Sequence, residues 1–279
     1  MNIVFFGSSS YVIPILKVLR KNFDLKLVLT TEKNPTDAVP SFCIKNKIPY
    51  LPVANLSNSA INHELSTINP VVGVLADFGL IIPPAILNLF PKGIINIHPS
   101  ILPKYRGPTP VQTAILEGVK TTGVSIIKLD EEVDHGPLLT QMEEKILPND
   151  TSESLYERLF KISSGSIVQT IELYLKGDIK PQEQNHKEAT FTNHLTRQSG
   201  FIDISNLKNK ISKLKPERMI RAYFPWPGVW TKWKMKNGKW KILKFLPNNK
   251  LQVEGKKPMS YKDFINGYPE GKEILKIIK

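Results

Sequence analysis

The sequence predicts an α/β fold: a Rossmann-like, mostly parallel doubly wound sheet, followed by a small basic β-barrel of the OB-like kind. Apolar runs of strand length alternate with helical patterns through the first half of the chain, which is typical of a parallel sheet with crossover helices. After residue 192 the pattern changes to short alternating strands separated by turn residues. We expect a first domain over residues 1–180, a linker over 181–192 and a basic domain over 193–279.

Four apolar runs mark the parallel strands of the first domain, at residues 3–6, 25–30, 71–76 and 94–98. Between them, helical spacing predicts helices over residues 12–19, 57–66 and 84–90. Two later runs, 124–128 and 138–145, predict further strands that we expect to be an antiparallel addition. The residues from Thr151 to Ser154 then cap a long helix that runs to Lys176, since apolar residues recur along it at helical spacing.

The second domain follows residues 177–192, which are polar and without periodicity, as in a linker. Alternating residues then predict three short strands over 230–235, 239–245 and 251–253. Asn237-Gly238 between the first two is a strong hairpin signal, because both residues tolerate the positive φ of a tight turn. The outward positions of these strands are mostly lysine.

Composition narrows the class of protein. No apolar run reaches the roughly 20 residues of a membrane span. The amino terminus lacks the charged region and cleavage site of a signal peptide. Cys43 is the single cysteine, which excludes an internal disulfide and leaves it without a partner cysteine for a metal site. We therefore expect a cytoplasmic enzyme.

The net charge of +13 is confined to the last third of the chain. Residues 1–180 hold 17 Lys+Arg and 17 Asp+Glu, whereas residues 181–279 hold 21 and 8. This asymmetry favours a neutral catalytic body with an accessory surface for a polyanion, and a solvated lysine-rich face is the alternative. We expect contacts to phosphates, which position without reading sequence, from the lysines of residues 232–244 and from Lys208, Lys210, Lys213 and Lys215.

The most informative segment is Asn96-Ile97-His98, at the end of a predicted strand. Side chains two apart on a strand point to the same face, so an amide and an imidazole lie side by side. The carboxyl ends of strands are where open α/β sheets bind ligands. Asp134, in an acidic loop, would complete a set suited to acyl transfer. Asn96 and His98 would donate to an oxyanion, and Asp134 would orient His98 or handle the proton.

Other segments support or limit this interpretation. The turn from Gly7 to Ser10 carries one of the three glycines of a dinucleotide fingerprint, so a serine-capped turn that lines a substrate pocket is favoured. Residues 77–83 predict an apolar wall for a flat ring, and the proline-rich residues 100–112 predict a preformed ligand loop. A metal site is disfavoured, because His98 and one carboxylate loop make a poor ligand set. The remaining histidines are interpreted as surface or structural residues: His63, His135, His186 and His194.

A resemblance to a known family rests on two motifs, Asn96-x-His98-Pro99-Ser100-x-Leu102-Pro103-x-Tyr105-Arg106-Gly107 and Asp130-x-x-x-Asp134-x-Gly136. Together they resemble the formyltransferases that use 10-formyltetrahydrofolate. Residues 218–230 and 255–268 resemble the second domain of the methionyl-tRNA formyltransferases. The resemblance implies formyl transfer to the α-amine of methionyl-initiator tRNA, without a metal and, we expect, by a monomer. A sugar-nucleotide amine formyltransferase with the same folate donor, and an RNA-binding protein with a decayed site, are the alternatives.

The resemblance also implies roles for single residues. Asn96, His98 and Asp134 form the catalytic set. The folate pocket is lined by Phe78, Leu80, Ile82, Ser100, Ile101, Leu102, Pro103, Asp130 and Val133. On the substrate side we expect Ser8, Ser9, Arg106 and Gly107. The chain departs from the family pattern at His135, where threonine or alanine is usual, at Asp77-Phe78-Gly79, where Ala-Tyr-Gly is common, and at residues 30–38, which lack a basic insertion.

Overall fold

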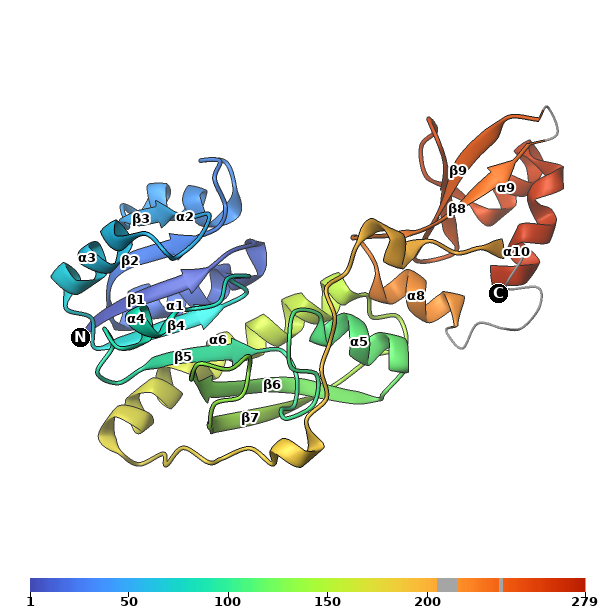
Figure 1. The fold of residues 1–279 in the computed structure, drawn as a ribbon. Coiled ribbons are helices and arrows are strands. Elements are labelled where there is room, and N and C mark those ends of the chain that lie inside the picture. Colours follow the sequence, from blue (N-terminus) through green and yellow to red (C-terminus); the bar gives the residue numbers. More distant parts are fainter. Residues whose placement is uncertain (205–214, 236–237, 279) are drawn as a thin grey trace. The chain divides into compact units, whose positions relative to one another are not determined.

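The computed structural model describes residues 1–204, 215–235 and 238–278, and it divides into two compact units (Figure 1). Unit 1 contains Met1–Pro110, Thr121–Lys145 and Tyr156–Thr192. Unit 2 contains Val111–Lys120, Ile146–Leu155 and Asn193–Lys279. Unit 2 is therefore assembled from three separate stretches of the chain.

Unit 1 is built around a seven-stranded sheet of order β3-β2-β1-β4-β5-β6-β7. Its five parallel strands are β1 (Asn2–Gly7), β2 (Asp24–Thr30), β3 (Tyr50–Pro52), β4 (Val72–Ala76) and β5 (Ile94–His98). The last two, β6 (Thr121–Lys128) and β7 (Leu138–Lys145), pair in antiparallel register. The predicted mostly parallel sheet and its antiparallel addition are both confirmed.

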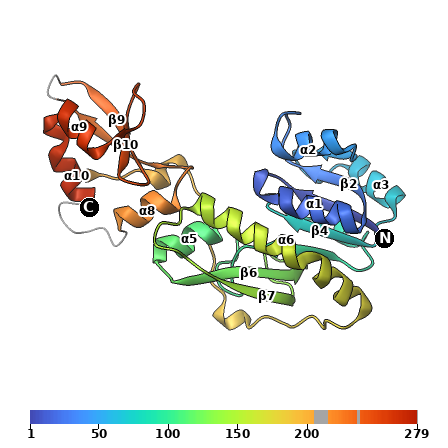
Figure 2. The same cartoon turned by 180° about the vertical axis from the view of Figure 1, so that it is seen from behind.

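Helices cover both faces of this sheet, which explains why β1 and β5 are buried along nearly their whole length. Figure 2 shows α1 (Ile13–Asn22) and α6 (Ser152–Lys176) in front of the sheet. On the other face, α3 (Ser59–Ile68) and α4 (Pro84–Leu87) bury a cluster that includes Phe6, Phe78 and Phe90. The remaining helices of the first 120 residues are η1 (Ser10–Val12), α2 (Ala38–Asn46) and α5 (Pro110–Glu117).

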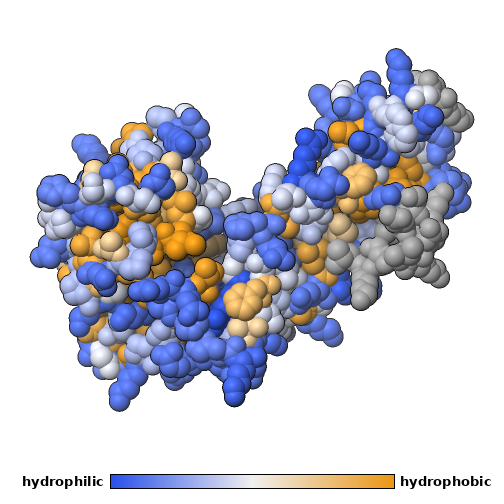
Figure 3. All heavy atoms as spheres, in the orientation of Figure 1, coloured by the Kyte–Doolittle hydropathy of each residue, from blue (hydrophilic) through white to orange (hydrophobic). Residues whose placement is uncertain are grey.

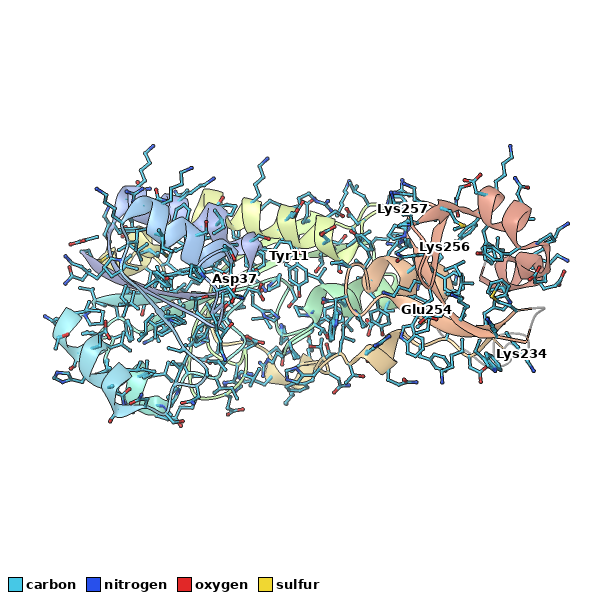
Figure 4. All side chains as sticks on the ribbon, turned by 90° about the horizontal axis from the view of Figure 1, so that it is seen from above. Tyr11, Asp37, Lys234, Glu254, Lys256 and Lys257 are labelled. Carbon is cyan, nitrogen blue, oxygen red and sulfur yellow. The ribbon has the colours of Figure 1, made fainter. Side chains whose placement is uncertain are left out.

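The long helix α6 begins where the sequence places its cap. The Ser154 amide donates to Thr151 Oγ1 at 3.2 Å, and the Thr151 amide donates to Ser154 Oγ at 3.0 Å. Tyr11, which Figure 4 labels, stacks on Tyr156 of α6 with ring centroids 5.5 Å apart. This contact fastens the turn after β1 to the helix, close to the carboxyl end of the strand.

Unit 2 contains a four-stranded antiparallel sheet of order β11-β10-β9-β8. Its strands are β8 (Val229–Lys234), β9 (Trp240–Leu246), β10 (Lys250–Val253) and β11 (Met259–Ser260). The three predicted strands are confirmed, whereas Asn237 of the predicted turn lies outside the described residues. Because β8 and β11 stand at the edges of the described sheet, the closure of an OB-like barrel stays a prediction.

The helices of the second half of the chain are η2 (His186–Glu188), η3 (Arg197–Gly200), α8 (Pro216–Ala222), α9 (Tyr261–Gly267), η4 (Pro269–Gly271) and α10 (Lys272–Ile278). The inward Trp233 of β8 meets Phe264 of α9 and Tyr268 edge-on, with centroids 5.5 Å apart in each pair. The alternate residues Lys232 and Lys234 are exposed, and Figure 4 labels Lys234 together with Glu254, Lys256 and Lys257 of the turn after β10. None of the helices described in either unit is long and apolar enough to cross a membrane.

Candidate active site

Asn96 and His98 occupy the carboxyl half of β5, and each is only 5 % exposed. Backbone pairing places β5 between β4 and β6, with Asn96 opposite Leu75 on one side and Ile127 on the other. The strand alternation turns both side chains to the same face, as the sequence predicts. An amide and an imidazole therefore lie at the end of a central strand, beside the end of β4.

The structure brings Asp134 to these two residues. Asp134 Oδ1 accepts a hydrogen bond from Asn96 Nδ2 at 3.1 Å, and Oδ2 accepts one from the Gly107 amide at 2.8 Å. Asp134 Oδ2 also lies 3.4 Å from His98 Nδ1. The backbone of Asp134 has a φ of 50°, a left-handed conformation that costs about 1–3 kcal/mol and is often found at functional sites.

The hydrogen-bond partner of Nε2, the second imidazole nitrogen of His98, defines the tautomer. His98 Nε2 lies 2.9 Å from the carbonyl oxygen of Tyr105. A carbonyl can only accept, so Nε2 carries the hydrogen and donates it, and Nδ1 faces the carboxylate of Asp134. One N–H of Asn96 is bonded to Asp134, and its second N–H remains for another acceptor. The arrangement can stabilise an oxyanion and move a proton in the same place.

A cavity of about 110 Å³ opens beside this set. Four of the nine residues predicted for the folate pocket line it, namely Leu80, Ile82, Asp130 and Val133, together with Asn96 and Asp134. Its exposed lining residues are both apolar and acidic: Ile81 is 74 % exposed and Val133 49 % exposed, and Glu131 and Glu132 are exposed as well. Figure 3 shows apolar atoms gathered on this unit over β1, β2 and β4.

The other five predicted residues are not among those that line the cavity. Phe78 is buried in the core, where its ring meets Phe6 edge-on with centroids 5.6 Å apart. The remaining four form a turn directly after β5: Ser100, Ile101, Leu102 and Pro103. Buried Ser125 of β6 holds this turn, because its Oγ donates to the Ser100 carbonyl at 2.7 Å and accepts from the Leu102 amide at 2.9 Å.

Ser8 and Ser9 lie in a polar cluster at the carboxyl ends of β1, β2 and β4. Ser8 Oγ is 2.7 Å from Thr31 Oγ1, and the Ser9 amide donates to Glu32 at 3.0 Å. Ser9 Oγ donates to Asp77 at 2.6 Å. Asp77 is an exposed residue, but the protein atoms around its carboxyl group displace part of the water that would solvate it. This loss of water raises the pKa of Asp77; the hydrogen bond from Ser9 opposes the rise, and the Glu32 carboxylate adds to it.

The predicted substrate residues Arg106 and Gly107 have different surroundings. The Gly107 amide is bonded to Asp134, as described above. Arg106 is 3 % exposed, and its Nη2 donates to Gln184 Oε1 at 2.7 Å and to His186 Nδ1 at 2.8 Å. Lys215 is exposed at the start of α8 in unit 2. The other three predicted lysines lie outside the described residues: Lys208, Lys210 and Lys213.

Sequence reasoning did not find the residues from 182 to 192 that contact this site. Gln184 is buried beside Asp134, although it lies in a polar stretch whose lack of periodicity predicts only a linker. His135 and His186, interpreted separately as surface or structural residues, stack with centroids 3.9 Å apart and ring planes at 5°. No composition signal distinguishes these residues from an ordinary linker.

The structure also bears on Cys43 and on metal binding. Burial raises the pKa of the Cys43 thiol to about 11, so the thiol stays protonated near neutral pH and is a poor nucleophile. Within the part of the chain that the structure describes, no group of three or more His, Cys, Asp or Glu side chains could hold a metal ion.

Comparison with known proteins agrees with the geometry. Residues 1–171 match the family model described as formyl transferase. The chain therefore belongs to the formyl transferase family, and the convergence of Asn96, His98 and Asp134 is the candidate active site of a formyltransferase.

Similar proteins indicate which members of the family this chain resembles. The chain is 37 % identical over 243 residues to the methionyl-tRNA formyltransferase of Chloroflexus aurantiacus, covering 84 % of this chain and 77 % of the relative. The enzyme of that name from Koribacter versatilis is 32 % identical over 307 residues, with 96 % of each chain covered.

Solved structures share the fold at lower identity. Methionyl-tRNA formyltransferase from Clostridium thermocellum has a TM-score of 0.62 at 22 % identity, covering 91 % of this chain and 97 % of that one. A 4-N formyltransferase from Francisella tularensis has a TM-score of 0.69 at 19 % identity, covering 88 % and 98 %. At these identities the likeness concerns the fold alone.

Proposed function

We propose that this protein transfers the formyl group of 10-formyltetrahydrofolate to the α-amine of methionyl-initiator tRNA, in the cytoplasm, and so supports translation initiation. The observation that carries the proposal is the carboxylate of Asp134, held by Asn96 and Gly107 within 3.4 Å of His98. The names of the relatives support the choice of acceptor.

The chemistry needs an oxyanion site and a path for one proton. When the unprotonated α-amine attacks the formyl carbon, a new C–N bond forms and the carbonyl oxygen gains negative charge. The second N–H of Asn96 is positioned to donate to that oxygen, and one such donor is worth about 10²–10³ in rate. His98 joins it in this proposal by exchanging the hydrogen bond from Nε2 to the Tyr105 carbonyl for one to the oxyanion. When the tetrahedral intermediate collapses, its bond to the folate nitrogen breaks, and Asp134, which lies beside His98, passes the proton from the attacking amine through a water to that departing nitrogen.

The donor end of the site suits a flat, largely apolar ring. Leu80, Ile82 and Leu129 line the cavity beside Asn96, and exposed Ile81 extends the apolar wall. The cavity of about 110 Å³ is smaller than the roughly 300–1,000 Å³ of typical ligand sites, so only the end of the donor enters it. In this proposal, Phe78 and the Ser100–Pro103 turn support the pocket walls, and no step uses a metal.

For the acceptor, we assign tRNA binding to a basic domain over residues 193–279, which includes the four-stranded sheet as part of an OB-like barrel. Exposed lysines on that sheet, Lys232, Lys234 and Lys244, face solvent together with Lys215 of the same unit. Contacts from such lysines to phosphates would position the tRNA without reading its sequence. We propose that a monomer suffices.

The test is a formyl-transfer assay with two classes of acceptor. Purified protein and 10-formyltetrahydrofolate are incubated with methionyl-initiator tRNA or with a nucleotide-linked amino sugar, and formylated product is quantified. We expect formyl-methionyl-tRNA, with uncharged tRNA giving no product because it lacks the amine. Formylation of the amino sugar alone would refute the tRNA acceptor and support the sugar-nucleotide alternative.

A further inference from the structure

Residues 182–192 form a strap, a segment in unit 1 that runs along the loops carrying the candidate active site. At one end, Gln182 exchanges backbone hydrogen bonds with Leu138, at 2.7 and 2.9 Å. At the other end, the Arg106 amide donates to the Thr190 carbonyl, and the Thr192 amide donates to the Arg106 carbonyl, both at 2.8 Å. The strap is therefore anchored by backbone pairing at both ends.

Gln184 of the strap contacts the loop that carries Asp134. Its side-chain Nε2 donates to the carbonyl oxygens of Asp134 at 2.9 Å and Gly136 at 2.7 Å. Its Oε1 accepts from Arg106 Nη2 at 2.7 Å. Only this orientation of the amide works, because a guanidinium only donates and a carbonyl only accepts. Gln184 is 5 % exposed, so these hydrogen bonds have little competition from water.

The strap reaches His98 through one intermediate residue. Thr190 Oγ1 accepts from the Tyr105 amide at 2.8 Å, and the Tyr105 carbonyl accepts from His98 Nε2 at 2.9 Å. The strap thus contacts the backbones that hold two members of the catalytic set.

A histidine pair makes a second connection to the same loop. His186 Nδ1 accepts from Arg106 Nη2 at 2.8 Å, so this nitrogen carries no hydrogen. The ring of His186 stacks on that of His135, whose Nδ1 lies 2.6 Å from Asp130 Oδ2. Gln184 therefore holds the end of the loop directly, whereas His186 is connected to Asp130 at the start of the loop only through His135.

We propose that two residues, Gln184 of the strap and Arg106, are positioning residues for Asp134. They hold the loop so that the left-handed Asp134 presents its carboxylate to Asn96 and His98. Arg106, which the sequence suggests as a substrate contact, acts in this proposal through Gln184. The kinetic part of the inference rests on the proposed function.

The decisive variant is Gln184→Glu, which keeps the shape and the acceptor for Arg106 but replaces two N–H donors with oxygen lone pairs. Two carbonyls then face a carboxylate, and the loop must move. A displacement of about 1 Å costs up to about 10²-fold in rate, so we expect kcat to fall by about 10–10²-fold with both KM values within about twofold. The matched control is Glu183→Gln, the reverse exchange at an exposed neighbour, which should leave kcat and KM unchanged.

A second variant and a second measurement separate this inference from the proposed function. His186→Ala, at an exposed position, should lower kcat less than Gln184→Glu and again leave KM unchanged. In protein without substrates, hydrogen exchange of the amides of residues 130–136 should be faster in Gln184→Glu than in the Glu183→Gln control. Unchanged exchange and kcat in Gln184→Glu would overturn the inference, as would a rise in KM without a fall in kcat. Faster exchange in a protein that transfers no formyl group would support the strap and refute the proposed function.

Discussion

Replacing Asp134 by asparagine tests the core of the proposed mechanism, because the two side chains have almost the same shape. Each carboxylate oxygen accepts from a different donor, Oδ1 from Asn96 and Oδ2 from the Gly107 amide. In one orientation, the new NH₂ group faces the donor of Asn96; in the other, it faces the donor of Gly107. Either way one hydrogen bond is lost and two donors meet, at a cost of about 1–3 kcal/mol.

The chemical loss is larger than the structural one. A carboxamide accepts no proton at neutral pH, and general acid–base catalysis typically contributes about 10²–10⁴-fold. With the disturbed position of His98 added, we expect Asp134→Asn to lower kcat by about 10³–10⁴-fold, equivalent to about 4–5.5 kcal/mol of transition-state stabilisation. KM values should change by less than about threefold, since the carboxylate acts mainly in the transition state.

The assay is single-turnover formyl transfer with enzyme in excess, so that product release does not hide the chemical step. Glu143→Gln, at an exposed position of β7, is the control for loss of one carboxylate and should be as active as the unaltered protein. Circular dichroism and a melting curve report whether each variant is folded. A rate for folded Asp134→Asn within tenfold of the unaltered protein would refute the assigned role.

Three further predictions follow from the same contacts. Asn96→Ala should lower kcat by about 10²–10³-fold with KM nearly unchanged, and a near-normal kcat would remove Asn96 from the oxyanion site. Asp77 has a folded pKa above its unfolded value, so ionisation of Asp77 disfavours folding as pH rises through the folded pKa. Asp77→Asn should therefore raise Tm relative to the unaltered protein at pH 8, and this difference should disappear as pH falls below about 4. A Tm difference that does not depend on pH would contradict the raised pKa of Asp77. Affinity for methionyl-tRNA should fall steeply with added salt. Replacing both Lys232 and Lys244 by neutral residues should reduce the steepness of the plot of log association constant against log salt concentration by up to about two units. An unchanged slope would argue for a lysine face that is merely solvated.

Periodic patterns explain why much of the fold could be predicted from sequence. The central parallel strands β1, β4 and β5 are largely buried, and Asn96 and His98 stand out as polar residues at the end of one of them. The acidic loop and the motif resemblance, rather than periodicity, indicated Asp134 as their partner. The convergence of these three side chains required coordinates, because a strand and a loop 36 residues apart are joined only by tertiary structure.

Physical reasons also explain why some elements could not be predicted from the sequence. Strand β3 has three residues, too few to show an alternation. Helix α5 begins at Pro110, a residue favoured at the first helical position, but the neighbouring prolines suggest a rigid loop instead. The strap is held by backbone hydrogen bonds and by side chains such as Gln184, and neither leaves a hydrophobic pattern. Polar segments that bind through their backbone are therefore difficult to distinguish from linkers by sequence alone.

The three-part construction of unit 2 has a consequence for how the chain is synthesised. Arg218 Nη1 donates to the Glu117 carbonyl at 2.7 Å, Arg221 Nη1 to the Asp150 carbonyl at 2.9 Å, and Ser152 Oγ to the Phe224 carbonyl at 2.6 Å. Residues 111–120 and 146–155 leave the ribosome well before these later partners are translated. The nascent chain can complete its parallel sheet early, while these two segments wait for the last quarter of the protein. A truncated gene product ending near residue 192 would leave the same segments without their partners and exposed to proteases.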